Sequence, residues 1–457
     1  MIEKKGQRMN LVKIQQNIKE SKDQSIETLK EFVRHPSVSR DKEAVEKCAY
    51  YLKSLLDKYN IDSKIYPTKG SPLVYGQVNS PNKNAKTVLF YGHYDVQPPE
   101  PLEDWHTPPF EPSIRKGRLY GRGAADNKGQ LLAHILAVKS ILEIEKTLPI
   151  NVKFIFEGEE EIGSGSLGPF VKENKDLLDC DLVITSDGPM HDSGAPILAF
   201  GVRGVMNFQL ELKTAQTDNH SGNKGGVIPN PAWELIELLT TMKDKNDLVT
   251  IEGFYDDVLK PSKKELTLIQ ALPFDPEDLA KVYGVEKIEL DKESFYKRLM
   301  LLPTLSINGL ISGYTGSGTK NIIPNKALAK MEVRMVKNQN PDDLFEKITN
   351  HIKKVNPNVT IISQEEDMYP SRTSLELDIS QKIIRAVKKA HKTDPLVFPS
   401  MGGSLPDYIW TKILGKPSIM VPYANADEAN HAPNENMDLT CFINGIHTSV
   451  HIINELK

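Results

Sequence analysis

The length, composition and charge of the chain exclude several classes of protein. Its 457 residues are too many for a single hydrophobic core, so two or three domains are expected. Hydrophobic residues make up 39% of the chain and charged residues 26%, which is typical of a soluble globular protein. The net charge of −4 gives no reason to expect a nucleic acid or an anionic membrane as a partner.

The cysteines and the first residues of the chain indicate a cytoplasmic protein. Cys48, Cys180 and Cys441 are scattered, and they form neither a disulfide framework nor a zinc motif. Residues 1–8 are polar and no apolar stretch follows them, so we expect no signal peptide and no membrane span. A reducing compartment, the cytoplasm, is therefore the expected location.

Helix-like and strand-like segments alternate from about residue 22 to residue 200. Helical apolar spacing predicts helices at 26–33, 44–56 and 128–144, the last with a single apolar stripe. Short apolar runs predict buried strands at 73–78, 88–90, 152–156 and 182–185. This alternation is typical of an α/β sandwich.

A different pattern begins near Val205. Alternating strands are expected at 206–212, 305–311 and 329–336, helices at 233–242 and 344–352, and a short strand at 359–362. The α/β pattern resumes with helices at 379–390 and 442–453 and strands at 396–398 and 418–421. We therefore expect one α/β domain made of residues 1–205 and 371–457, with an α+β domain inserted at 206–370.

The run Tyr91-Gly-His-Tyr-Asp-Val-Gln-Pro98 follows an apolar strand directly. Because side chains alternate along a strand, His93 and Asp95 point to the same side. This geometry suits an imidazole that binds a metal while a carboxylate holds its second nitrogen. A polar pair in a loop would produce the same pattern, so the run alone does not decide between the two.

Two acidic clusters follow further along the chain. Asp126 lies in the glycine-rich run 121–129, either as a helix cap or as a carboxylate that bridges two cations. Glu159, Glu160 and Glu161 follow the strand at 152–156, and they repel one another unless water or cations lie among them. Neighbouring carboxylates of this kind can divide the roles of metal ligand and general base.

Two single residues complete a constellation with these clusters. Asp187 follows another apolar strand, and His431 stands in Ala429-Asn-His-Ala-Pro-Asn434. Ligands of open α/β sheets gather at such strand ends. Two histidines and three carboxylates suit two divalent ions better than one.

A competing interpretation rests on Gly163-Ser-Gly-Ser-Leu-Gly168. This run matches a dinucleotide-binding fingerprint, and Asp187 lies 19 residues further on. An NAD-dependent oxidoreductase is therefore an alternative. The glutamates just before the run argue against it, because they would face the pyrophosphate.

Taken in order, these motifs resemble the co-catalytic metallopeptidases of peptidase family M-twenty. That family includes carnosine dipeptidases, aminoacylases, carboxypeptidase G and succinyl-diaminopimelate desuccinylases. The resemblance extends from about residue 25 to the end of the chain. It implies a zinc-peptidase-like α/β sandwich as the catalytic domain and an inserted α+β lid and dimerisation domain.

The resemblance also implies the roles of residues in the catalytic domain. Two divalent ions per chain are expected, zinc first, with manganese or cobalt as alternatives. Asp95 would orient one histidine ligand, and Glu160 would act as general base on a water that bridges the two ions. Gly163 and Ser164 fix this alignment of the glutamate run. The implied metal ligands are His93, Asp126 as the bridge, Glu161, Asp187 and His431.

In the inserted domain the resemblance implies the substrate contacts. His220, in Asp218-Asn-His-Ser-Gly222, would stabilise the oxyanion in its own site or in that of a partner subunit. Arg334 would hold the carboxylate of the substrate, and Ser404, in Gly402-Gly-Ser-Leu-Pro406, would contact the same carboxylate. Asn321 stands where the closest dipeptidases carry a hydroxyl residue, and its amide would be another neutral donor.

The expected function is hydrolysis of an amide bond in dipeptides or short peptides by a homodimer that assembles through the lid. The size of the insert and the form of the His93 motif favour the dipeptidase branch. An N-acyl-amino-acid deacylase or desuccinylase with the same dinuclear site is the nearest alternative. A non-catalytic binding protein of this fold is a third possibility, which the intact Glu160 argues against.

Overall fold

The computed structural model describes residues 9–363 and 367–457, and the chain divides into two compact units. The α/β unit comprises the residues up to Gly201, Arg372–Pro399 and Ile409–Lys457. The inserted unit comprises Val202–Ser371 and Ser400–Tyr408. Within the described residues, no helix combines the length and the apolar character needed to cross a membrane.

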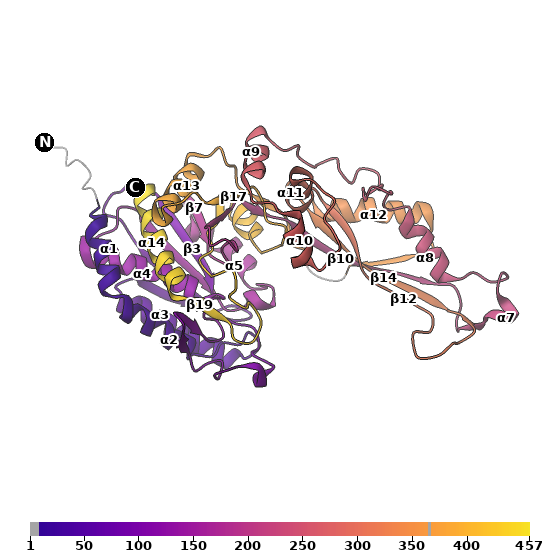
Figure 1. Cartoon of the computed structure of the whole chain (residues 1–457), viewed down its shortest axis with the longest axis horizontal. Helices are drawn as coiled ribbons and strands as arrows, with labels where there is room; N and C mark the ends of the chain where they lie inside the picture. Colours follow the sequence, from indigo (N-terminus) through magenta and orange to yellow (C-terminus); the bar gives the residue numbers. More distant parts are fainter. Residues whose placement is uncertain (1–8, 364–366) are drawn as a thin grey trace. The chain divides into compact units, whose positions relative to one another are not determined.

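An eight-stranded mixed sheet forms the centre of the α/β unit (Figure 1). The strand order is β1-β2-β6-β3-β7-β18-β8-β17. Strands β6, β3, β7 and β18 run parallel to one another, whereas β1, β2 and β6 are antiparallel neighbours. The strands are β1 (Asp62–Tyr66), β2 (Leu73–Val78), β3 (Thr87–His93), β6 (Asn151–Glu157), β7 (Leu182–Thr185), β8 (Ile197–Ala199), β17 (Leu396–Phe398) and β18 (Ser418–Met420).

Helical segments cover both faces of this sheet. Phe90 and Tyr91 are consecutive residues of β3 and therefore point to opposite faces. Phe90 stacks on His134 of α4 (Lys128–Glu145), and Tyr91 packs on Trp410 of the π-helix Ile409–Leu414. The unit is therefore a three-layer sandwich, as the alternation of elements predicts.

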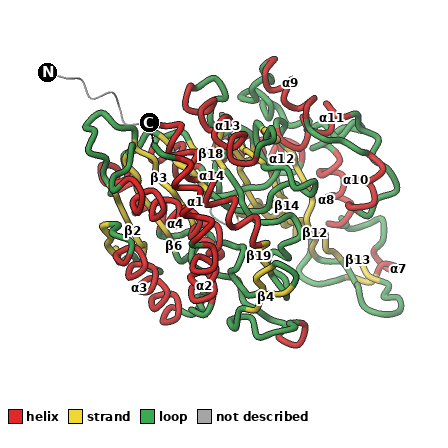
Figure 2. The backbone as a smooth tube through the Cα atoms, turned by 60° about the vertical axis from the view of Figure 1, so that its left-hand side comes forward, coloured by secondary structure: helices red, strands yellow, loops and turns green. Residues whose placement is uncertain are grey.

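Helix α4 is buried around most of its circumference, not along the single stripe expected from the sequence. Every residue from Lys128 to Ile141 is buried. Helix α14 (Leu439–Leu456) packs against α4, and Figure 2 shows the two helices close to each other. Gly445 permits this close approach, since a Cβ there would lie 2.8 Å from the Tyr423 ring and 3.2 Å from the Ala133 Cβ.

Shorter elements complete the α/β unit. A three-stranded sheet joins β19 (Asn436–Asp438), β5 (Arg118–Tyr120) and β4 (Ser113–Arg115). The remaining helices are α1 (Leu11–Glu20), α2 (Lys22–Val33), α3 (Lys42–Lys58), α5 (Leu167–Glu173), α6 (Lys175–Leu178) and α13 (Asp378–His391).

The inserted unit is built on a four-stranded antiparallel sheet of order β12-β14-β10-β15. Its strands are β10 (Gly204–Lys213), β12 (Thr304–Ser312), β14 (Lys326–Met335) and β15 (Thr360–Ser363). A two-stranded pair, β11 (Asn219–His220) with β13 (Ile322–Ile323), lies near the short helix α7 (Ser221–Lys224).

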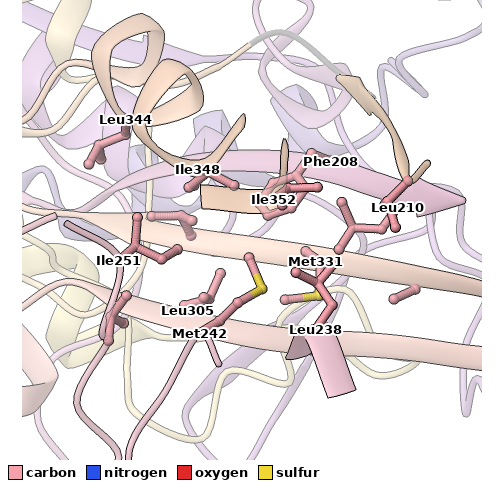
Figure 3. Packing of buried hydrophobic residues seen from close by; sticks show 14 of the residues in the cluster. Phe208, Leu210, Leu238, Met242, Ile251, Leu305, Met331, Leu344, Ile348 and Ile352 are labelled. Atoms are coloured by element: carbon pink, nitrogen blue, oxygen red, sulfur yellow. The ribbon is translucent and has the colours of Figure 1, made fainter. Parts of the chain in front are cut away.

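Two amphipathic helices cover one face of this sheet. Helices α8 (Pro231–Thr240) and α12 (Pro341–Val355) enclose a core that includes Phe208, Met331 and Ile348 (Figure 3). Alternate residues of β14, such as Glu332 and Arg334, point to the other face. Residues 250–300 add three helices, α9 (Lys263–Ala271), α10 (Pro276–Tyr283) and α11 (Lys292–Met300).

Candidate active site

The carboxyl ends of parallel strands meet at one edge of the α/β sheet, and this edge gathers the candidate residues. His93 ends β3 and pairs with Glu157 at the end of β6, while Asp187 follows β7. Gly92 lets the start of α4 come close, since a Cβ there would lie 2.8 Å from the Cβ of Leu131. The parallel order therefore brings together residues that are far apart in the sequence.

The first candidate metal group comprises His93, Asp126 and Asp187. Nε2 of His93 lies 2.9 Å from Oδ1 of Asp126 and 3.6 Å from Oδ2 of Asp187. His93 and Asp126 are buried, and Asp187 is partly buried. One imidazole nitrogen and two carboxylates thus face a common point.

The second candidate group comprises Asp126, Glu161 and His431. Nε2 of His431 lies 3.1 Å from Oδ2 of Asp126 and 3.1 Å from Oε2 of Glu161. Asp126 therefore belongs to both groups, with Oδ1 toward His93 and Oδ2 toward His431. A bridging carboxylate between two cations requires this division of its oxygens.

The donor atoms fit divalent cations. Nε2 of His93 and Oδ1 of Asp126 are buried and close, yet neither makes a hydrogen bond of acceptable geometry. Burial opposes a charge on His93, but the carboxylates of Asp126, Asp187 and Asp95 hold its pKa well above the ordinary value. Burial likewise opposes ionisation of Asp126, but the two imidazoles hold its pKa well below the usual range. Carboxylates this crowded need positive charge, and two ions bound by imidazole and carboxylate would supply it.

Asp95 organises the site in a way that differs from simple orientation of His93. Its backbone carbonyl lies 3.1 Å from Nδ1 of His93, whereas its carboxylate is 3.5 Å from that nitrogen. The carboxylate accepts hydrogen bonds from the Ser39 hydroxyl at 2.7 Å and from the backbone amides of Glu160 and Glu161 at 3.2 Å each. Asp95 thus fixes the glutamate run as well as the imidazole.

The three glutamates of the run have three different environments. Glu159 is occupied, because its carboxylate accepts from the backbone amides of Ser71 at 2.8 Å and Ser166 at 3.1 Å. Glu161 belongs to the second metal group. Glu160 belongs to neither group. Burial raises its pKa well above the ordinary value; the charge of His93 opposes this rise, and the nearby carboxylates add to it. Of the three glutamates, Glu160 is therefore the one outside both metal groups and outside the contacts that hold Glu159, and its role as general base stays a prediction.

The glycine run 163–168 does not form a phosphate-binding turn. The Ser166 amide, which a pyrophosphate would need, donates to Glu159. The helix that follows, α5, has only seven residues. The dinucleotide interpretation therefore lacks the geometry that it requires.

Several residues that support the site were not identified from the sequence. Gln97 donates to Oε2 of Glu161 at 2.9 Å, although it lies inside the motif that contains His93. Glu435 is fully buried and accepts from the backbone amides of Gly123, Ala125 and Asp126 at 3.0 Å each. Nη1 of Arg122 donates to the same carboxylate at 2.8 Å. A glutamate four residues after His431 carried no sequence signal for this role.

One more buried carboxylate belongs to this neighbourhood. Glu428 is 2% exposed, and neither of its side-chain oxygens has a hydrogen-bond partner among the described residues. Burial, followed by the charges of Asp126, Glu435 and Asp187, raises its pKa to about 9. With such a pKa the Glu428 side chain is protonated near neutral pH when no cation is bound, and cations bound nearby would favour its ionised form.

In the inserted unit, Arg334 and Ser404 lie together. Nη1 of Arg334 donates to Oγ of Ser404 at 2.8 Å. Segment 400–408 therefore packs with the inserted unit, although the expected boundaries placed it in the α/β domain. The predicted contact loop and the predicted carboxylate-binding arginine are adjacent.

His220 and Asn321 lie together near the Lys326 end of β14, away from Arg334. His220 is exposed and pairs with Ile322, and Asn321 accepts a backbone hydrogen bond from Ser221 at 3.1 Å. Asn321 precedes β14, which begins at Lys326, and His220 pairs with Ile322 next to it. Arg334 lies eight residues beyond Lys326 along the same strand. At roughly 3.3 Å per residue, the two places are about 26 Å apart along the strand. One chain therefore does not bring Asn321 beside Arg334.

The chain is similar to known proteins over most of its length. The model of the Peptidase family M20/M25/M40 matches residues 89–455. The human Beta-Ala-His dipeptidase is 32% identical over 82% of this chain and 75% of its own length. The Cys-Gly metallodipeptidase dug1 of Schizosaccharomyces pombe is 30% identical over 98% of this chain and 99% of its own length.

Solved structures show the same architecture. The M20 family metallo-carboxypeptidase Sso-CP2 of Sulfolobus solfataricus superposes with a TM-score of 0.83 and 35% identity, covering 94% of this chain and 99% of that one. Human carnosine dipeptidase 1 gives a TM-score of 0.73 and 28% identity, with 98% and 99% covered. The expected fold class, the resemblance and the enzymatic nature of the chain are confirmed. The chain belongs to the metallopeptidase family M20/M25/M40, with relatives in its dipeptidase branch.

Proposed function

We propose that the enzyme hydrolyses the amide bond of dipeptides and other short peptides that carry a free C-terminal carboxylate. The observation that carries this proposal is the pair of metal groups that share Asp126, with Glu160 beside them but in neither. The similarity to enzymes named as Beta-Ala-His and Cys-Gly dipeptidases supports the substrate class.

The five ligands would hold two divalent ions, with zinc as the first choice and manganese or cobalt as alternatives. His93 and Asp187 would serve one ion, Glu161 and His431 the other, and Asp126 both. Bound there, the ions would lower the pKa of a water and polarise the carbonyl of the substrate.

Glu160 is the proposed general base. It takes a proton from the attacking water and returns it to the leaving amine. A carboxylate with a raised pKa is suited to this exchange, because its affinity for the proton lies closer to neutral pH. Asp95, through its bonds to the Glu160 and Glu161 amides, keeps the base next to the ligands.

A homodimer would explain where His220 and Asn321 act. Within one chain both residues are far from Arg334, so we infer that they serve the site of a second subunit, where His220 would stabilise the oxyanion. Strand β12 supports pairing about a two-fold axis. Among the described residues it pairs only with β14, and it exposes Ile307, Leu310 and Ile311.

We also propose a cytoplasmic location. The three cysteines are free, and Cys48 and Cys180 are buried, so no disulfide stabilises the fold. Free buried thiols are typical of proteins from reducing compartments.

A substrate panel tests the proposed activity. The enzyme, loaded in turn with zinc, manganese or cobalt, is assayed on Cys-Gly, β-Ala-His, Ala-Ala, N-acetyl-alanine and N-succinyl-diaminopimelate. We expect cleavage of the free dipeptides and a much lower rate on the acylated compounds. Cleavage of the acylated compounds alone would instead establish the deacylase or desuccinylase activity.

A further inference from the structure

Two arginines of the inserted unit lie side by side at the start of its sheet. Arg203 immediately precedes β10, and Val205 of β10 pairs with Arg334 of β14. Both side chains contact the same loop, since Arg203 bonds to Gly402 and Arg334 bonds to Ser404. The sequence motifs pointed to Arg334 and not to Arg203.

Arg334 is largely engaged within its own chain. Its Nε donates to Oε1 of Glu332 at 2.8 Å, and its Nη2 donates to Oε2 of the same carboxylate at 2.9 Å. Nη1 donates to Ser404. A guanidinium can bind a carboxylate through Nε and Nη2 together, and in Arg334 both of these nitrogens already bond to Glu332. A substrate carboxylate would reach only the hydrogens that remain on the two terminal nitrogens.

Arg203 is anchored, but its terminal nitrogens are not used. Its Nε donates to the carbonyl of Gly402 at 2.7 Å, and its backbone amide bonds to the carbonyls of Met401 at 3.3 Å and Gly403 at 3.1 Å. Within the part of the chain that the structure describes, Nη1 and Nη2 of Arg203 have no hydrogen-bond or ion-pair partner. The guanidinium is thus held in one orientation, and its terminal nitrogens Nη1 and Nη2 are available to bind a ligand.

Among the described residues, the charges that act on Arg203 are those of Arg334 and Glu332, and Glu332 already pairs with Arg334. Burial first, and then the charge of Arg334, lowers the pKa of Arg203 to about 10. A partly buried cation beside another cation is unfavourable unless an anion joins them. One bound carboxylate would neutralise the net positive charge of Arg203, Arg334 and Glu332.

We propose that Arg203 is a second carboxylate-binding residue, which holds the C-terminal carboxylate of the substrate together with Arg334. This inference rests on the proposed function and adds a specificity-determining residue to it. The loop at Gly402 fixes the direction of the Arg203 guanidinium, and Ser404 fixes that of Arg334. Gly402 packs against Leu299 of α11, since a Cβ there would lie 2.7 Å from Cδ1 of that leucine.

The test compares a free dipeptide with its C-terminal amide. Wild-type enzyme, Arg203→Met and Arg203→Lys are loaded with zinc and assayed on Cys-Gly and on cysteinyl-glycinamide. Arg298→Met is the matched control, because Arg298 is an exposed arginine of the same unit, 3.7 Å from Asp247. Thermal unfolding and metal content are measured for every variant.

We expect Arg203→Met to lower kcat/KM on the free dipeptide by a factor on the order of 10 to 100, mainly through KM, as for the loss of a charge-assisted hydrogen bond. The rate on the amide should change less than about twofold, because the amide lacks the charge that Arg203 recognises. Arg203→Lys keeps the positive charge but not the paired N–H donors of the guanidinium, so its loss of kcat/KM on the free acid should be smaller than that of Arg203→Met. Arg298→Met should match the wild type.

Equal losses on the acid and on the amide would overturn the inference, because they would mean that Arg203 only holds the loop. Should Arg203→Met fail to fold, Arg203→Lys carries the same comparison, and an acid-selective loss remains the required result. A wild-type enzyme that cleaves neither compound would overturn the proposed function itself. A wild-type enzyme that cleaves both equally would overturn only the carboxylate recognition.

Discussion

Replacement of Glu435 by glutamine should damage both the stability of the α/β unit and its metal content. The Glu435 carboxylate is fully buried and accepts four hydrogen bonds, one from Arg122 and three from the backbone of Gly123, Ala125 and Asp126. One of these amides belongs to the residue shared by both metal groups. Glu435 therefore connects the folding of the glycine-rich loop to the position of Asp126.

The size of the effect follows from what glutamine leaves unpaired. Its amide nitrogen would face Nη1 of Arg122 and the amide of Gly123, both of which are donors. Arg122 is 1% exposed, so its buried charge would lose the one carboxylate that pairs with it among the described residues. Breaking a buried ion pair in this way costs about 3–5 kcal/mol. Replacing Arg122 by methionine in the same variant should recover part of that loss, because the buried charge is then gone.

Denaturant unfolding followed by tryptophan fluorescence measures this effect, together with elemental analysis of bound metal. Trp105 is a local reporter, since the guanidinium carbon of Arg122 lies 5.5 Å from the centre of its ring. Glu43→Gln is the control, because it breaks an exposed pair with Lys47 that contributes little to stability. A Glu435→Gln protein within about 1 kcal/mol of the wild type, with two ions bound, would refute this role of Glu435.

Three further predictions concern the metal site and the assembly. Asp126→Ala should lose both ions together, whereas His431→Ala should weaken mainly one, as elemental analysis of dialysed protein would show; loss of a single ion from Asp126→Ala would contradict the bridge. Removal of metal by a chelator should lower the unfolding temperature, because Asp126, Asp187 and Glu161 then face one another without cations; an unchanged temperature would mean that no ion binds there. Mixing the His220→Ala and Glu160→Gln proteins should restore part of the activity in hybrid dimers. If verified hybrids show no restored activity, His220 acts in the site of its own subunit.

The catalytic edge of the sheet was predictable because local patterns determine it. Strands β2, β7 and β17 lie where the apolar runs place them. Strands β3, β6 and β7 run parallel, so their carboxyl ends lie on one side of the sheet. The residues that end or follow β3, β6 and β7 must then converge, whatever their separation in the sequence. His93, Glu161 and Asp187 were identified for this reason.

Elements without a clear pattern were not predictable. Strand β1 has the sequence Asp-Ser-Lys-Ile-Tyr and forms an edge of the sheet, so it shows little apolar alternation. Helices α9, α10 and α11 lie in a segment for which no element was predicted, although local capping marks their starts, as with Ser262 and Glu265.

Long-range polar contacts were the hardest to foresee. The bonds of Glu435 join residues more than 300 positions apart, and no periodicity marks them. The position of segment 400–408 depends on the side chains of Arg203 and Arg334, which bond to Gly402 and Ser404. Such contacts result from the complete fold and leave no local signature in the sequence.

The central claim is that Glu160 is the general base beside a two-metal site whose ligands include Glu161. Turnover of the metal-loaded Glu160→Gln and Glu161→Gln proteins, measured with their metal content and unfolding temperature, tests it most directly. Glu160→Gln should keep both ions and the fold but lose turnover by a factor on the order of 10² to 10⁴, while Glu161→Gln should lose part of its metal. An active Glu160→Gln enzyme, together with an inactive Glu161→Gln enzyme that retains both ions, would contradict the assignment.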